Sequence, residues 1–325
     1  MIKIQNLVKN YGGIQAVKNI SFTVEEGEIV GFLGPNGAGK STVMNILTGY
    51  LSSTSGEVEV NGINVLENPV EAKRQIGYLP EQPPLYPDMT VKEYLSFVYE
   101  LKGCKLKKDA HLAEICEVVK IKDVYNRVIR NLSKGYRQRV GIAQALIGNP
   151  KVVIFDEPTV GLDPKQIIES RSLIRDLGRN HTVILSTHIL PEVQAVCDRI
   201  VIINKGRIVA NEKTMEISRA VEGAGKLSIK ICGPEREVVS ALRAISGIST
   251  VEALGARDAD SITYYVESTK GLDVRKVIFR VMAQNGWPII GMESMGVNLE
   301  DIFLSVVDDP DTAAGKKKNG KGGKA

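Results

Sequence analysis

The chain has 325 residues, room for about two domains at roughly 150 residues each. Apolar residues make up 43% and charged residues 25% of the sequence, a globular composition that excludes fibrous, collagenous and wholly disordered proteins. The formal net charge is +4, and residues 311–325 alone carry five Lys and one Asp, so the rest balances 37 cationic against 37 acidic side chains; this neutral body argues against a protein that coats nucleic acid, and we expect no nucleic-acid partner.

No stretch approaches the ~18 apolar residues of a membrane-spanning helix, and the first residues lack the pattern of a signal peptide. We therefore expect a protein that stays in the cytosol, where a partner can still hold it at a membrane. The cysteines are too far apart for a C-x-x-C metal or redox site, and we expect all of them to be reduced packing residues. They are Cys104, Cys116, Cys197 and Cys232.

The first chemical motif follows a short apolar run, Ile29–Leu33, which predicts a strand buried on both faces. The next nine residues fit the pattern G-x-x-x-x-G-K-[ST], and helical spacing continues over Val43–Leu47. Glycines let successive backbone N–H groups curl around a phosphate chain, and the helix directs its positive end at the same anion. The predicted phosphate-binding residues are Gly34, Pro35, Asn36, Gly37, Ala38, Gly39, Lys40, Ser41 and Thr42.

Within this loop, Lys40 has the length to reach the β- and γ-phosphates, and the Ser41 hydroxyl is a ligand for Mg²⁺. Residues 83–150 carry no comparable strand and predict a separate helical lobe, with one helix over Arg139–Ile147. After it comes a buried strand, Val152–Phe155, that ends in Asp156 and Glu157. Asp156 is expected to hold Mg²⁺ through water, and Glu157 to act as general base on the attacking water.

Two more buried strands are predicted at Val183–Leu185 and Ile200–Ile203, and a helix over Gln166–Leu177. Strands that alternate with helices favour an α/β fold, with a parallel sheet covered on both faces, for residues 1–213. His111 and His181 match no motif, and we expect both at the surface.

The pattern changes after residue 213, where residues 214–225 predict a linker. Residues 226–307 then follow the order β-α-β-β-α-β, which is typical of a smaller α+β, ferredoxin-like domain. A last helix is predicted around Leu299–Val306. The Lys- and Gly-rich residues 308–325 are expected to be a disordered tail; contact of this tail with anionic lipid is the alternative.

Residues 1–213 resemble the ATP-binding-cassette (ABC) ATPases, a class of P-loop NTPase, because further motifs follow the phosphate loop in that family's order. Asn131–Arg139 resembles the family signature, with Lys134 and Tyr136 where the commonest form has Gly and Gln. The Leu-Ser-Lys-Gly-Tyr form is similar to that of gliding-motility and drug-type exporter ATPases. The other matching positions are Tyr11 before the first strands, Gln82 in the Q-loop, Gly161–Pro164 in the D-loop and His188 as switch histidine.

The resemblance implies a homodimer in which each ATP lies between the phosphate loop of one chain and the signature of the other. It implies catalytic roles for Glu157, His188 and Gln82, and Mg²⁺ ligation by Ser41, Gln82 and Asp156. It further implies that ATP contacts Ser133 and Gly135 of the mate, adenine stacking on Tyr11, and an interface role for Asp163. ATP and Mg²⁺ are the implied cofactors, and the implied partner is an integral membrane permease that holds the chain at the cytoplasmic face of the inner membrane.

Residues 83–91 are apolar and rich in proline, and in the resembled family this region helps hold a permease helix. Tyr86, Met89 and Tyr94 are candidate anchors for that helix, and ordinary packing within the lobe is the alternative. The domain at 226–307 shows no catalytic cluster; dimerisation, ligand sensing and contact with another subunit all remain open for it.

The first functional hypothesis is the ATP-hydrolysing subunit of an ABC exporter. The second is a soluble ABC-type ATPase that acts on ribosomes or DNA. The single cassette, the lack of a heptad run and the charge-neutral body of the sequence argue against it. The third is a regulator that binds ATP without hydrolysing it, against which stands Glu157.

Overall fold

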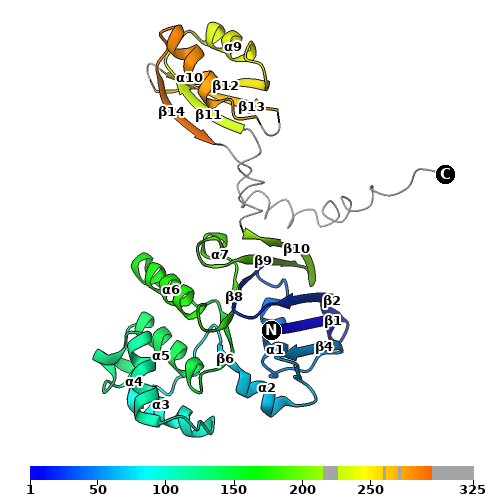
Figure 1. Ribbon diagram of the computed structural model, residues 1–325, viewed down its shortest axis with the longest axis vertical. Coiled ribbons are helices and arrows are strands. Elements are labelled where there is room, and N and C mark those ends of the chain that lie inside the picture. The colour runs from blue at the N-terminus through cyan, green and yellow to red at the C-terminus, as the bar shows by residue number, and fades with distance from the viewer. Residues whose placement is uncertain (215–225, 259–260, 270–271, 295–325) are drawn as a thin grey trace, which may run out of the picture. The chain divides into compact units, whose positions relative to one another are not determined.

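The computed structural model describes residues 1–214, 226–258, 261–269 and 272–294. The chain divides into two compact units, with the boundary after Thr214 (Figure 1). The predicted linker over 214–225, apart from Thr214, the predicted last helix and the Lys-rich tail lie outside the described residues. Among the residues that are described, no helix is long and apolar enough to cross a membrane.

The first unit is built on a six-stranded sheet in the order β10-β9-β3-β8-β7-β6. Its strands pair in parallel except at the edge, where β10 is antiparallel to β9. The four strands predicted from apolar runs are confirmed, each within two residues at either end, because a strand covered on both faces needs a continuous apolar run. The bounds are β3 Ile29–Leu33, β6 Ile76–Leu79, β7 Val152–Asp156, β8 Thr182–Thr187, β9 Arg199–Asn204 and β10 Arg207–Lys213.

A second, antiparallel sheet in the order β2-β1-β4-β5 completes the core of this unit. Its strands are β1 Ile2–Tyr11, β2 Ile14–Val24, β4 Ser55–Val60 and β5 Ile63–Asn64. Buried side chains of both sheets form one cluster, in which Phe22 of β2 stacks on Phe32 of β3 with 5.5 Å between ring centroids. Tyr11 was expected to precede the first strands, which is wrong, because it is the last residue of β1.

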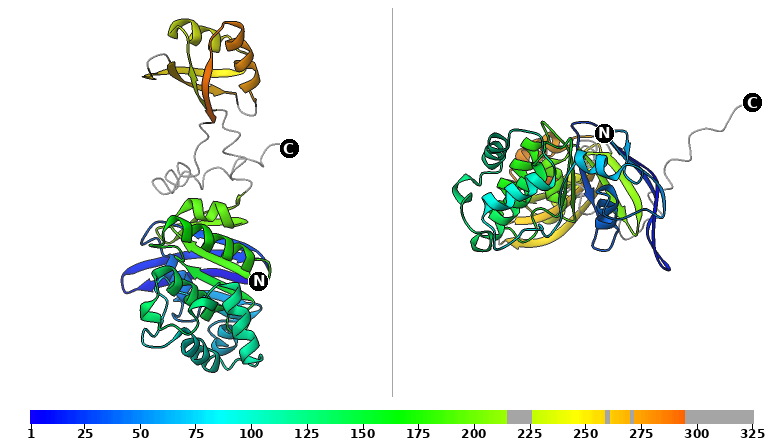
Figure 2. Two further views of the ribbon diagram at one scale, coloured as in Figure 1. Left: turned by 90° about the vertical axis from the view of Figure 1, so that its left-hand side faces the viewer. Right: turned by 90° about the horizontal axis from the view of Figure 1, so that it is seen from below.

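Within residues 1–214, four helices accompany the two sheets and form with them the sheet region of this unit. They are α1 Lys40–Leu47, α2 Pro69–Gln75, α6 Pro164–Leu177 and α7 Leu190–Val196. The helical lobe predicted over 83–150 contains α3 Val91–Leu101, α4 Lys108–Val118 and α5 Lys134–Leu146, with short 3-10 turns at Lys122–Val124 and Ile129–Asn131. Both figures show this lobe on one side of the unit and the blue antiparallel strands on the other (Figures 1 and 2).

The side chain of Tyr94 lies inside the helical lobe and is 2% exposed. Its hydroxyl donates to the carbonyl oxygen of Pro84 at 3.2 Å. The prediction that Tyr94 lines a permease groove is therefore wrong, because helix α3 turns this position toward its own core. Tyr86 remains half exposed and packs edge-on against Phe97, at 5.5 Å between ring centroids.

His111 and His181 are both buried, so the prediction that they lie at the surface is wrong. The Nε2 of His111 accepts the N–H of Gly148 at 3.0 Å, and the Nδ1 of His181 lies 2.7 Å from the carbonyl oxygen of Pro150. Both rings thus satisfy backbone groups in the turn between α5 and β7, and such partners make burial of an imidazole tolerable. The cysteines are free; Cys116 and Cys197 are buried, the other two partly so.

The second unit contains β11 Lys226–Ile231, α9 Glu235–Arg243, β12 Ile248–Asp258, β13 Ser261–Ser268, α10 Arg275–Gln284 and β14 Ile289–Ser294. The predicted order β-α-β-β-α-β is confirmed. Its strands pair antiparallel in the order β12-β13-β11-β14, which is the strand order of a ferredoxin-like sheet. The apolar side chains of both helices and the sheet form its own core, with Ile229, Tyr264 and Ile278 fully buried.

Candidate functional site

The phosphate loop joins β3 to α1 in a conformation that only glycine allows at several points. Gly37 and Gly39 have φ of 78° and 108°, in the left-handed region, and Gly39 is the N-cap of α1. A Cβ on Gly34 would lie 2.3 Å from the carbonyl oxygen of Ile203. The loop is therefore pressed against β9 at Gly34 and against the Ala16 carbonyl oxygen at Gly39, and has no room for a side chain at either position.

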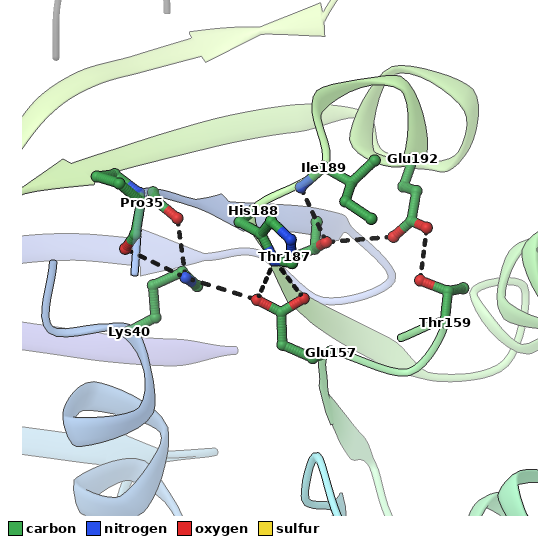
Figure 3. A network of polar contacts seen from close by, with 9 residues as sticks. Pro35, Lys40, Glu157, Thr159, Thr187, His188, Ile189 and Glu192 are labelled. Carbon is green, nitrogen blue, oxygen red and sulfur yellow. Dashed lines mark hydrogen bonds and ion pairs between the residues drawn. The ribbon is translucent and has the colours of Figure 1, made fainter. Parts of the chain in front are cut away.

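Lys40 lies inside this loop and is 6% exposed. Its Nζ donates to the carbonyl oxygens of Gly34 at 2.8 Å and Pro35 at 3.4 Å, and lies 3.5 Å from Oε1 of Glu157 (Figure 3). The ammonium thus stands between the loop backbone and the carboxylate that follows β7. Three oxygen neighbours compensate a cation in a buried place.

Asp156 and Glu157 are brought to the loop because β7 is separated from β3 only by β8. Asp156, the last residue of β7, is 3% exposed, and burial raises the pKa of its carboxyl group. Its Oδ1 has no hydrogen-bond partner among the described residues. Asp156 lies within electrostatic range of Lys40, which adjoins Ser41 in the sequence. A buried carboxylate oxygen without a partner and a serine hydroxyl are the kind of oxygen ligands that Mg²⁺ prefers.

Glu157 is held in an uncommon backbone conformation, with φ of +50°. Its N–H donates to the carbonyl oxygen of Ser186 at 2.8 Å, which ties it to β8. Both carboxylate oxygens lie 3.0 Å from Nδ1 of His188, the first residue after β8 (Figure 3). Lys40, Glu157 and His188 therefore form one contiguous polar group from three elements that are far apart in the sequence.

A cleft of about 360 Å³ opens over these groups. Eight of the predicted residues line it: Asn36, Gly37, Gly39, Lys40, Ser41, Thr42, Glu157 and His188. Three lining residues were not predicted: Ala16, Glu81 and Val160. Glu81 adjoins Gln82 in sequence, and Gln82 itself is exposed. Tyr11 is half exposed, with Nζ of Lys9 5.3 Å from its ring centroid.

The signature and D-loop residues form a second group, on α5 and α6. Ser133 is the N-cap of α5 and accepts the N–H of Tyr136 at 3.4 Å; Asp163 is the N-cap of α6. A Cβ on Gly135 would lie 2.6 Å from the side chain of Gln166, and one on Gly161 would lie 2.1 Å from Nζ of Lys134. Within the described chain, none of these residues is among those that line the cleft.

A buried polar group that no sequence motif predicted is formed by Thr159, Thr187 and Glu192, next to Glu157 and His188 in the chain. Its signal in the sequence is slight: Glu192 is an acidic residue in the first turn of α7, a position that the helix dipole favours.

Similarity to known proteins identifies the family to which the chain belongs. Residues 17–160 match the family model described as ABC transporter. The linearmycin resistance ATP-binding protein of Bacillus subtilis is 32% identical over 317 residues, which are 94% of this chain and 98% of that protein. The chain belongs to the ABC transporter ATP-binding proteins. The bacitracin transport ATP-binding protein of Bacillus licheniformis is 40% identical over 210 residues, 64% of this chain and 68% of that protein.

Solved structures agree with the family. A dimeric bacterial ABC transporter cassette is 30% identical and covers 66% of this chain and 99% of its own, with a TM-score of 0.61. A dimeric cassette in a post-hydrolysis state, bound to ADP and phosphate, is 29% identical over the same shares, with a TM-score of 0.60. This ABC protein is an ATPase, the ATP-binding subunit of a transporter.

Proposed function

We propose that this chain is the ATP-hydrolysing subunit of an ABC exporter, in which two copies close head to tail on two ATP molecules and drive a separate integral membrane permease. In this proposal the chain is peripheral, at the cytoplasmic face of the inner membrane. The observation that carries the proposal is the separation of the two motif groups, because a cleft that holds Lys40 and Glu157 without Ser133 and Gly135 is half of a nucleotide site. Relatives named for bacitracin transport and linearmycin resistance support the exporter type.

In the proposed site, the γ-phosphate would replace the loop carbonyls as a partner of the Lys40 ammonium. Glu157 would accept a proton from the attacking water, and His188, 3.0 Å from both of its oxygens, would orient that carboxylate. The remaining loop residues contribute backbone N–H groups to the phosphates: Gly34, Asn36, Gly37, Ala38, Gly39 and Thr42. Pro35 has no N–H and contributes its fixed backbone shape.

The side chains that we propose to hold Mg²⁺ are Ser41, Asp156 and Gln82, of which Asp156 supplies the unpartnered oxygen described above. The ion would neutralise part of the negative charge of the phosphates. From the mate, Ser133 would direct its hydroxyl and the N-terminus of α5 at the γ-phosphate. Gly135 would allow close approach, Asp163 would meet the mate, and Tyr11 would stack on adenine.

A hollow of about 550 Å³ between the sheet region and the helical lobe is the proposed seat of a permease helix. It is lined by Asn45, Thr48, Tyr50, Lys73, Ile76, Tyr78, Pro80, Pro84, Lys102 and Gln144. Tyr50 is 82% exposed, and the aromatic pair of Tyr86 and Phe97 is also exposed. Exposed aromatic rings are typical anchors for a partner helix; of these three rings Tyr50 lines the hollow itself.

The deciding experiment is Glu157→Gln. We expect the variant to bind ATP but hydrolyse it at least ~100-fold more slowly, since removal of a general base costs about that much, and to elute as a dimer in gel filtration with ATP. Glu114→Gln, an exposed change on α4, is the control and should hydrolyse ATP as the wild type does. A Glu157→Gln protein that binds ATP and stays monomeric would contradict the paired site.

Purification of the tagged protein from gently solubilised membranes tests the partner. A stoichiometric integral membrane protein is expected, and Tyr86→Glu should lose it while ATP binding is retained. Ile14→Glu, an exposed apolar position in the other sheet, should keep it. Recovery with ribosomes or DNA instead would favour a soluble ABC-type ATPase that acts there.

A further inference from the structure

Glu192 is a carboxylate enclosed by the protein, with 1% of its surface exposed. Among the described residues, no lysine, arginine or histidine forms an ion pair with it. Its two oxygens are instead bound by two hydroxyls: Thr159 Oγ1 donates to Oε1, and Thr187 Oγ1 donates to Oε2 at 3.2 Å (Figure 3). A buried carboxylate is costly unless its oxygens accept hydrogen bonds; an apolar residue of this size avoids that cost. The position therefore calls for a reason beyond packing.

The two threonines belong to the two segments that hold the proposed hydrolytic pair. Thr159 lies two residues after Glu157, in a turn where Val160 N–H donates to the Glu157 carbonyl oxygen at 3.4 Å. Thr187 directly precedes His188 at the end of β8. The Thr187 hydroxyl also accepts the N–H of Ile189 at 3.1 Å, so it holds the backbone on the other side of His188.

We propose that Glu192 is a positioning residue for ATP hydrolysis, which fixes the segment after Glu157 against the segment that carries His188. This inference rests on the roles proposed above for those two residues. The 3.0 Å contacts between the His188 ring and the Glu157 carboxylate depend on two separate loops. Among the residues that the structure describes, Glu192 alone accepts hydrogen bonds from side-chain hydroxyls of both loops, and Glu157 has the positive φ that needs support from its surroundings.

Three single variants test this role. Glu192→Gln keeps the shape of the side chain, but its amide NH₂ is a donor, so it cannot accept a hydrogen bond from each hydroxyl as the carboxylate does. Thr159→Val and Thr187→Val each remove one hydroxyl donor. We expect kcat to fall at least 10-fold in Glu192→Gln, while the dissociation constant for a fluorescent ATP analogue changes less than 3-fold. Thr182→Val is the control. It removes a buried threonine hydroxyl at the opposite end of β8, where Oγ1 accepts the N–H of Gly27, and should leave kcat unchanged.

Two combinations separate positioning from packing. The triple variant Thr159→Val, Thr187→Val and Glu192→Met replaces the whole polar group by apolar side chains of similar size, which is often neutral for stability. We expect its thermal midpoint to return to the wild-type value while kcat stays low. Recovery of kcat together with the midpoint would overturn the proposal.

The second combination adds Glu192→Gln to Glu157→Gln. We expect no further loss of kcat, because the residue to be positioned is already gone; a further 10-fold loss would overturn the positioning role. If Glu157→Gln alone retains wild-type hydrolysis, the proposed role of Glu157 fails and this inference fails with it. If Glu192→Gln does not fold, Thr159→Val and Thr187→Val are tested by the same measurements.

Discussion

Lys102 offers the sharpest test of how the helical lobe is held together. It follows the last residue of α3, and its Nζ donates to the carbonyl oxygens of Gln144, Ala145 and Ile147, at 2.9, 3.2 and 3.0 Å. One ammonium thus joins the C-terminal end of α3 to that of α5, whose carbonyls have no partners within their own helix. The change Lys102→Met keeps the apolar stem and removes only the donor.

Two opposing terms set the expected magnitude. Each hydrogen bond from a charged donor contributes ~1.5–3 kcal/mol, so three of them contribute ~4–9 kcal/mol. Burial lowers the pKa of Lys102 to about 8 from its ordinary 10.5, and at ~1.4 kcal/mol per pH unit this desolvation costs about 3 kcal/mol. The difference between these terms predicts that Lys102→Met loses ~1–6 kcal/mol of unfolding free energy. At a shift of ~2–4 °C per kcal/mol for a unit of this size, the midpoint of thermal unfolding should fall by about 10 °C.

The assay is thermal unfolding of the full chain at pH 7 and again at steps from pH 8 to 10.5. Within that range the unfolded chain keeps a proton on Lys102 that the folded chain releases, so wild-type stability rises with pH relative to Lys102→Met. Below about pH 8 the difference between the two proteins should be constant. Lys92→Met, an exposed change on α3, should change the free energy of unfolding by less than ~0.5 kcal/mol. A Lys102→Met midpoint within 1 °C of wild type, or a flat difference up to pH 10.5, would refute the reasoning.

Three further outcomes are expected. Gly34→Ala should weaken binding of a fluorescent ATP analogue at least 10-fold, because its Cβ would lie 2.3 Å from the Ile203 carbonyl oxygen. Burial raises the pKa of Glu28, but hydrogen bonds from Arg199 and from the Glu25 N–H, together with the attraction of Arg199 and Lys213, outweigh burial and lower the pKa below its ordinary 4.5. The stability from these contacts should be present above pH 4.5 and lost as pH falls through the lower folded pKa, and acid titration of Arg199→Met should show a smaller loss. Deletion of residues 226–325 should leave ATP-analogue affinity unchanged, since the first unit has its own core.

The sequence predicted the parallel sheet far better than the antiparallel one. Strands such as β7 and β8 are buried throughout and appear as unbroken apolar runs. Strands β1 and β2 alternate instead, and their alternation is interrupted: Asn6 and Asn19 have φ of 47° and 57°, and the pairing register of β1 shifts between Ile4 and Leu7. Each bulge moves the following side chains to the other face, so the period of two that marks a half-buried strand is lost.

The candidate site was predictable as far as local motifs reach. The phosphate loop and the acids after β7 stand in short patterns whose chemistry follows from residue type and spacing. Thr159 and Glu192, in contrast, are 33 residues apart, and nothing in the local sequence distinguishes a buried Glu192 from an exposed acid on a helix. The buried histidines show the same limit, because their partners are backbone atoms of a distant turn.

The segment 157–163 connects the two halves of the proposed site within one chain. It begins at Glu157, whose carboxylate meets Lys40 and His188, and ends at Asp163, which caps α6 by accepting the N–H of Gln166 at 2.9 Å. Thr159, bound to Glu192, lies between these ends. If closure of the dimer moves Asp163, the shift has only five intervening residues in which to be absorbed before it reaches Glu157. An anchor at Thr159 would therefore decide how much of that movement reaches the carboxylate, and Thr159→Val should weaken the dependence of hydrolysis rate on protein concentration as well as lower its maximum.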